Sequence, residues 1–151
     1  MQGTRTVSEL PPETMQFAHS MFDAARNGNA ELLLQAVDAG LPVNLTNESG
    51  NTLLMLAAYA GHPELVRGLI ERGADPNRLN DRQQSPLAGA VFKGEDEVVH
   101  VLCEAGADPR LGTPNAIQSA RMFGKTELLS VFGAREGEGA EAPLPVLVAT
   151  T

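Results

Sequence analysis

Glycine recurs at one fixed interval in two independent series. The positions are Gly28, Gly61 and Gly94 in one series, and Gly40, Gly73 and Gly106 in the other, and every step in both series has the same length. Such a period is typical of chains built from repeated supersecondary units, because each unit buries its apolar face only against its neighbours. The spacing therefore predicts a stack of similar units rather than a fold with one central core.

The unit from Asn47 to Leu79 indicates two short helices followed by a turn. Thr52 is placed to cap a first helix over residues 53–60, and Gly61 can end it in the left-handed conformation. Pro63 and Glu64 suit the first turn of a second helix. Its apolar stripe is Leu65, Val66, Leu69 and Ile70. The Asp-Pro-Asn run at 75–77 is typical of a turn that leads out of the unit.

The next unit, residues 80–112, repeats the pattern with a Ser85-Pro86 start. Its second helix carries the same stripe at Val98, Val99, Leu102 and Cys103. Cys103 occupies the position of Ile70, so we interpret it as a small core residue. A reactive thiol is the alternative.

Two segments carry a resemblance to a known family. GNTLLMLAAYAGHPELVRGLIERGADPN (50–77) and SPLAGAVFKGEDEVVHVLCEAGADP (85–109) resemble the ankyrin repeat. The resemblance implies an all-α solenoid of paired antiparallel helices joined by β-hairpin-like turns. The motif histidine of the family is replaced by Met55 and Ala88. Because that histidine ties neighbouring turns together, we expect its loss to lower stability.

Both ends of the repeat region depart from the pattern, as capping repeats of a solenoid do. Gly124 follows Gly94 at a shorter interval than Gly94 follows Gly61, so the hairpin between Asp108 and Asn115 is three residues shorter than its counterparts. We expect a flexible segment over 1–10 and a repeat domain over 11–134. Its repeats are predicted at about 14–46, 47–79, 80–112 and 113–134, with modified first and last repeats.

The composition changes after Gly133, where glycine, glutamate and alanine predominate. This predicts an acidic, disordered tail over residues 135–151. It ends in the apolar stretch Leu144–Thr151. Three interpretations stay open for that stretch: a cloning remnant, a frayed end, or a segment that docks on the repeats or on a partner.

Charge and composition exclude several classes of function. The net charge of −8 and a pI near 4.8 disfavour binding to nucleic acid, which needs clustered Lys and Arg. No apolar run approaches the roughly 20 residues of a membrane span, and the first residues lack the apolar stretch expected of a signal peptide. We therefore expect a cytoplasmic monomer. Arg outnumbers Lys 9 to 2, which favours a GC-rich, bacterial genome.

No catalytic constellation is visible, so we expect neither an enzyme nor a cofactor or metal site. Glu95-Asp96-Glu97 suits the positive end of a helix dipole without any catalytic role.

The resemblance to ankyrin repeats implies that a protein partner docks on the concave face, formed by first helices and hairpin tips. Carried over by position, the candidate partner-binding residues are Arg26, Glu48, Ser49, Asn51, Tyr59, Asp81, Arg82, Gln84, Phe92, Lys93 and Met122. Tyr59, Phe92 and Met122 occupy equivalent positions and should form a row. Exposed large apolar residues commonly mark a contact surface. The alternative is that Phe92 and Met122 pack on their neighbours.

The sequence thus favours a protein–protein interaction module. A dedicated inhibitor or helper of one enzyme encoded alongside it is the alternative hypothesis, and an enzyme is a remote third.

Overall fold

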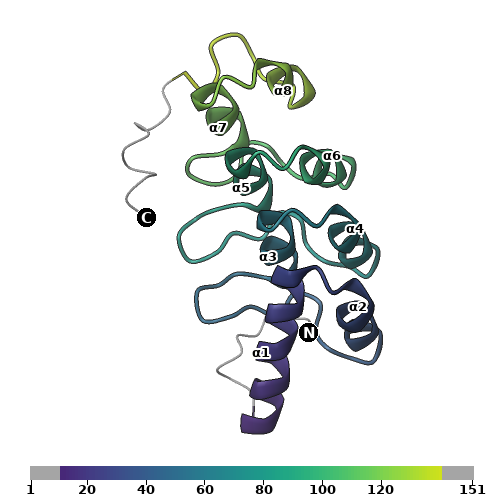
Figure 1. Ribbon diagram of the computed structural model, residues 1–151. Coiled ribbons are helices and arrows are strands. Elements are labelled where there is room, and N and C mark those ends of the chain that lie inside the picture. Colours follow the sequence, from purple (N-terminus) through teal and green to yellow (C-terminus); the bar gives the residue numbers. More distant parts are fainter. Residues whose placement is uncertain (1–10, 141–151) are drawn as a thin grey trace.

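The computed structural model describes residues 11–140, and within that range every regular element is a helix. The helices occur in pairs (Figure 1). In chain order they are α1 (Pro12–Asn27), α2 (Ala30–Asp38), α3 (Leu53–Tyr59), α4 (Pro63–Glu71), α5 (Pro86–Lys93), α6 (Asp96–Glu104), α7 (Ala116–Met122) and α8 (Thr126–Val131). The all-α prediction is therefore confirmed. An antiparallel bridge between Thr46 and Thr52 closes the first connecting hairpin.

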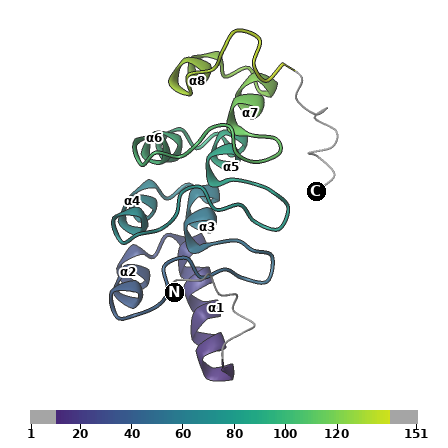
Figure 2. The same ribbon diagram turned by 180° about the vertical axis from the view of Figure 1, so that it is seen from behind.

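The pairs stack in two columns. The first helices α1, α3, α5 and α7 pack on one another in order, and α2, α4 and α6 form the second column. The connecting loops project from the first helices on the side away from the second column, which both views show (Figures 1 and 2). This arrangement leaves the first helices and the loops to form one continuous face.

Short polar side chains cap the N-termini of three first helices, α3, α5 and α7. Thr52 and Ser85 each accept a hydrogen bond at 3.0 Å, from the backbone N–H groups of Met55 and Ala88 respectively. Asn115 and Gln118 form a reciprocal capping box at the start of α7. The step from Ser85 to Asn115 is three residues shorter than the step from Thr52 to Ser85, so the chain reaches this cap early, as the glycine spacing predicts.

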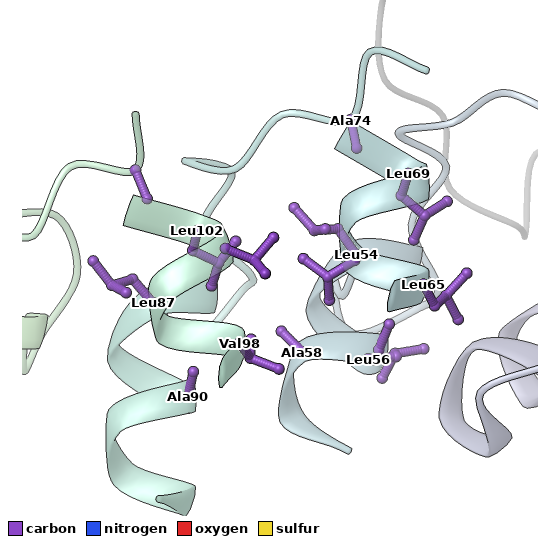
Figure 3. Packing of buried hydrophobic residues seen from close by; sticks show 14 of the residues in the cluster. Leu54, Leu56, Ala58, Leu65, Leu69, Ala74, Leu87, Ala90, Val98 and Leu102 are labelled. Atoms are coloured by element: carbon purple, nitrogen blue, oxygen red, sulfur yellow. The ribbon is translucent and has the colours of Figure 1, made fainter. Parts of the chain in front are cut away.

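The core lies between the two columns (Figure 3). Leu54 of α3 and Leu69 of α4 are fully buried, as is Leu102 of α6. Small residues such as Ala58 and Ala90 allow adjacent first helices to approach closely. Fully burying one such leucine contributes about 1.5–3 kcal/mol. Cys103 is half-buried, and burial raises the pKa of its thiol.

A different histidine links neighbouring repeats where the motif histidine is absent. The Nε2 atom of His62 lies 2.8 Å from the carbonyl oxygen of Arg26, one repeat earlier. The imidazole also lies so close to Gly28 that a Cβ there would be 2.5 Å from its Nδ1 atom. Met55 and Ala88 occupy the positions of the motif histidine, whereas His62 links the repeats at the Gly-His turn.

Asparagine side chains join the turns that follow successive second helices. Asn44 accepts a hydrogen bond from the N–H of Asp75 at 2.9 Å, and Asn77 accepts one from the N–H of Asp108 at 2.7 Å. Arg110 follows Asn77 by the same interval as Asn77 follows Asn44, so it occupies the equivalent position of the next repeat. Its guanidinium donates at 3.0 Å to the carbonyl of Gly133. The last link of the stack therefore uses a longer, charged side chain.

The chain after α8 returns toward α7, with turns over residues 136–140 (Figure 1). Arg110 donates to both carboxylate oxygens of Glu138, at 2.7 and 3.0 Å, and Arg121 donates to the Glu138 carbonyl at 2.8 Å. Gly139 is buried beside Ile117. The composition predicts disorder from residue 135, but these contacts hold the described part of that segment. The apolar stretch Leu144–Thr151 lies outside the described residues.

Candidate interaction surface

A pocket of about 200 Å³ opens on the face formed by the first helices and the loops. We call it the aromatic pocket. Its lining comes from three first helices, with Tyr59 of α3, Ala88, Gly89, Phe92 and Lys93 of α5, and Ser119 of α7. The loops before α5 and α7 add Gln84 and Pro114. The pocket therefore spans three consecutive repeats.

Tyr59 forms a fixed wall of the aromatic pocket. Its hydroxyl donates to the carbonyl of Ser85 at 3.2 Å, and burial raises the pKa of Tyr59 to about 12. The ring lies directly against Gly89, where a Cβ would be only 1.8 Å from the ring atom Cε1. Gly89 has ordinary helical geometry, so the close approach of the ring explains the glycine.

Phe92 and Phe123 form an exposed aromatic pair at the edge of the pocket. Their ring centroids are 5.2 Å apart, and the rings meet edge to face at 76°. Both side chains stay nearly half exposed, at 46% and 45%. An edge-to-face pair is favourable by about 0.5–1.5 kcal/mol, so each ring helps to fix the orientation of the other.

The cation beside this apolar surface is Lys93. Lys93 is exposed and makes no ion pair with any residue in the range 11–140. Lys125, by contrast, lies 4.0 Å from the Asp96 carboxylate. In a chain of net charge −8, Lys93 therefore places a positive charge beside the pocket that a carboxylate can pair with.

The hairpin tips next to the pocket are joined by hydrogen bonds. Asn80 donates through its amide to Asn51 and to Gln84, both at 2.8 Å. The backbone N–H of Asp81 donates to the carbonyl of Ser49 at 3.0 Å. The side-chain oxygens of Asn51 and Gln84 accept these bonds, so both residues act in part as structural supports.

The structure brings four of the predicted binding residues to one place: Tyr59, Gln84, Phe92 and Lys93 line the aromatic pocket. Asp81 and Arg82 are exposed at the adjoining tip. Two others lie toward the N-terminal end of the stack. Arg26 pairs with Asp23 at 3.0 Å, and Glu48 lies 3.5 Å from His19.

Met122 does not line the pocket, although its position is equivalent to those of Tyr59 and Phe92. It is half-buried, and its neighbour Phe123 contacts Phe92 instead. Phe123 caps the C-terminus of α7, where the last turn leaves the repeat pattern. Equivalence along the repeat therefore does not place Met122 beside the pocket, and its role in partner binding stays a prediction.

Sequence reasoning also missed Ala88, Gly89, Pro114 and Ser119. A glycine inside a helical pattern is a usable signal, because it costs about 1 kcal/mol relative to alanine and often marks a close approach. Gly89 carried that signal. Pro114 and Ser119 carried none, since their place beside the pocket depends on how α7 packs on α5.

The described residues hold no group of three His, Cys, Asp or Glu side chains able to bind a metal ion. In the same range, no helix is both long and apolar enough to cross a bilayer.

Stacked pairs of antiparallel helices, with loops that project on one side and a pocket on that face, define an all-α repeat solenoid. A sequence profile of ankyrin repeats, in three copies, matches residues 21–113, which is more than half of the chain. The protein therefore belongs to the ankyrin repeat family. Ankyrin repeats are generally protein–protein interaction modules, and the family is typically non-enzymatic.

Two relatives illustrate the similarity. An ankyrin repeat protein of Pseudomonas aeruginosa is 53% identical over 51 residues, which cover 34% of this chain and 30% of that protein. The crystal structure of the human ASB11 ankyrin repeat domain matches with a TM-score of 0.66 and 28% identity. That match covers 74% of this chain and 52% of the human one. The chain thus aligns with only part of either relative.

Proposed function

We propose that this protein binds another protein through the face of its first helices and loops, with the aromatic pocket at the centre of the contact. One observation carries the proposal: Phe92 and Phe123 form a preoriented aromatic pair, and both rings remain nearly half exposed beside a pocket. Exposed apolar surface of this kind commonly marks a contact site.

The rigidity of the pocket supports this proposal. Tyr59 is held by its hydrogen bond and by Gly89, and Asn80 holds the neighbouring tips together. Binding therefore requires little ordering of these groups, which would otherwise oppose association by about 0.5–1.5 kcal/mol per side chain. Buried aromatic anchors in such pockets dominate the energetics of many interfaces.

A photo-crosslinking residue placed at Phe92 tests the proposal in the native cell. We expect one protein to be captured at position 92. The matched control is Leu32 of α2, which is equally exposed at 44% but lies on the second column. Capture of the same protein at Leu32 with none at Phe92 would show that the partner uses a different face.

A binding measurement with the captured protein completes the test. We expect Phe92→Ser to weaken binding by at least about 2 kcal/mol, as for a central anchor. Val131→Ser, at a residue of α8 that is 50% exposed, should leave affinity unchanged. Equal affinity for the parent and Phe92→Ser would exclude the aromatic pocket as the contact centre. Repeated capture of a single enzyme would favour a dedicated helper or inhibitor over a general adaptor.

A further inference from the structure

We propose that the aromatic pocket has an intramolecular occupant, the apolar stretch Leu144–Val148 of this chain, which covers the pocket when no partner is bound. The proposal concerns the same surface as the proposed function. It does not depend on that function, because an intramolecular contact can be measured without any partner.

The end of the described chain lies within reach of the pocket. Glu138 and Gly139 are fixed against Arg121 and Ile117 of α7, and α7 also supplies Ser119 to the pocket. An extended chain rises about 3.3 Å per residue, so Leu147 can lie up to about 23 Å beyond Ala140. Packed helices are about 8–10 Å apart, so this length suffices to return from α7 to α5.

The chemistry of the segment matches that of the pocket. From Ala142 onward the printed sequence carries no charged residue, in a chain that is 20% charged overall. Pro143 and Pro145 favour an extended backbone, which suits a peptide lying in a groove. The stretch supplies Leu144, Val146, Leu147 and Val148, and the exposed rings of Phe92 and Phe123 offer an apolar surface for them.

The charges of Glu141 and Lys93 also support this contact. Glu141 directly precedes this uncharged stretch, and Lys93 is the exposed cation beside the pocket. Lys93 has no carboxylate partner among residues 11–140. Pairing Glu141 with Lys93 would fix the direction in which the segment enters.

Because the segment belongs to the same chain as the pocket, even a weak contact between them would be populated. A short linker gives an effective concentration in the millimolar range. A contact with a dissociation constant near 1 mM would then be about half formed. An external partner with micromolar affinity would displace the segment readily.

Tyr59 gives a direct readout, because it is the single tyrosine of a chain without tryptophan. Acrylamide quenching of tyrosine fluorescence therefore reports the accessibility of the pocket wall. In the full-length variant Leu144→Asp/Leu147→Asp we expect the quenching constant to rise up to about twofold, since about half of the molecules lose their cover. The matched control is Thr150→Asp/Thr151→Asp, which adds the same charge beyond the apolar stretch and should behave like the parent. Equal quenching of the parent and of the leucine variant would overturn the proposal.

A photo-crosslinking residue at Leu147 locates the contact. With a mixture of isotopically light and heavy full-length chains, we expect products within one chain that join position 147 to a peptide containing Phe92 or Phe123. Products between light and heavy chains would identify a second copy as the occupant and overturn the proposal, as would crosslinks elsewhere on the repeats. Neither outcome would affect the proposed partner binding, which the crosslinking residue at Phe92 tests separately.

Discussion

Gly89 is a glycine whose role depends on a residue in another repeat. An added Cβ would lie 1.8 Å from Cε1 of Tyr59, so Gly89→Ala must displace the ring and weaken its hydrogen bond to Ser85. We expect a loss of about 1–3 kcal/mol from overpacking, reduced by the roughly 1 kcal/mol that alanine gains in a helix. The free energy of unfolding in urea measures the change.

The Tyr59→Ala background supplies the control for that substitution. Removing the ring removes the three closest contacts of the new Cβ, so Gly89→Ala should be neutral or stabilising there. The difference between the two backgrounds isolates the coupling between the residues. An equal loss of stability in both would mean that the glycine is required for another reason.

The residues that sequence reasoning identified correctly are those whose role the repeat itself fixes. Thr52 and Ser85 cap helices because they stand at the same place in successive units. Phe123 stands in the shortened last unit, and Arg110 stands at the regular interval but replaces the asparagine of the pattern. Their partners Phe92 and Glu138 are distant from them in sequence. Periodicity carries no information about such contacts, because they depend on the packing of the shortened last repeat.

At the scale of elements, the C-terminal turn is joined to the third repeat by an ion pair. Hydrogen bonds from the Arg110 guanidinium, with one from the Arg135 backbone, lower the pKa of Glu138 to about 2. A carboxyl with a lowered pKa in the folded state stabilises the fold above its unfolded pKa of 4.5, and this contribution is lost as the pH falls toward 2.

Glu138→Gln tests that link. The variant should melt at a lower temperature than the parent at pH 7. The difference should shrink as the pH is lowered from 4.5 and disappear near pH 2. Melting curves of both proteins across this range provide the measurement. Glu136→Gln, at an exposed carboxyl of the same turn, is the control and should melt like the parent throughout. A pH-independent difference would show that Glu138 acts through packing instead of charge.

At the scale of the molecule, the packing of the helices follows the order of the chain. Each first helix packs on the first helix before and after it, and the second helices α2, α4 and α6 do the same. Stability in such a stack is close to a sum over repeats and the contacts between neighbours. The aromatic pocket, which spans α3, α5 and α7, exists only while three consecutive repeats stay folded.

This arrangement predicts that a destabilising substitution in a central repeat lowers the stability of more repeats than one in the last repeat. Leu54 of α3 is fully buried between two neighbouring repeats, whereas Leu128 of α8 is 6% exposed in the last pair of helices. Each leucine-to-alanine substitution should lose about 2–5 kcal/mol locally. Leu54→Ala should lower hydrogen-exchange protection in all repeats, because it interrupts the stack. Leu128→Ala should lower protection in α7 and α8 while α3 and α4 keep theirs. If Leu128→Ala instead reduces protection uniformly, the repeats unfold as one unit, and the aromatic pocket is as stable as the whole stack.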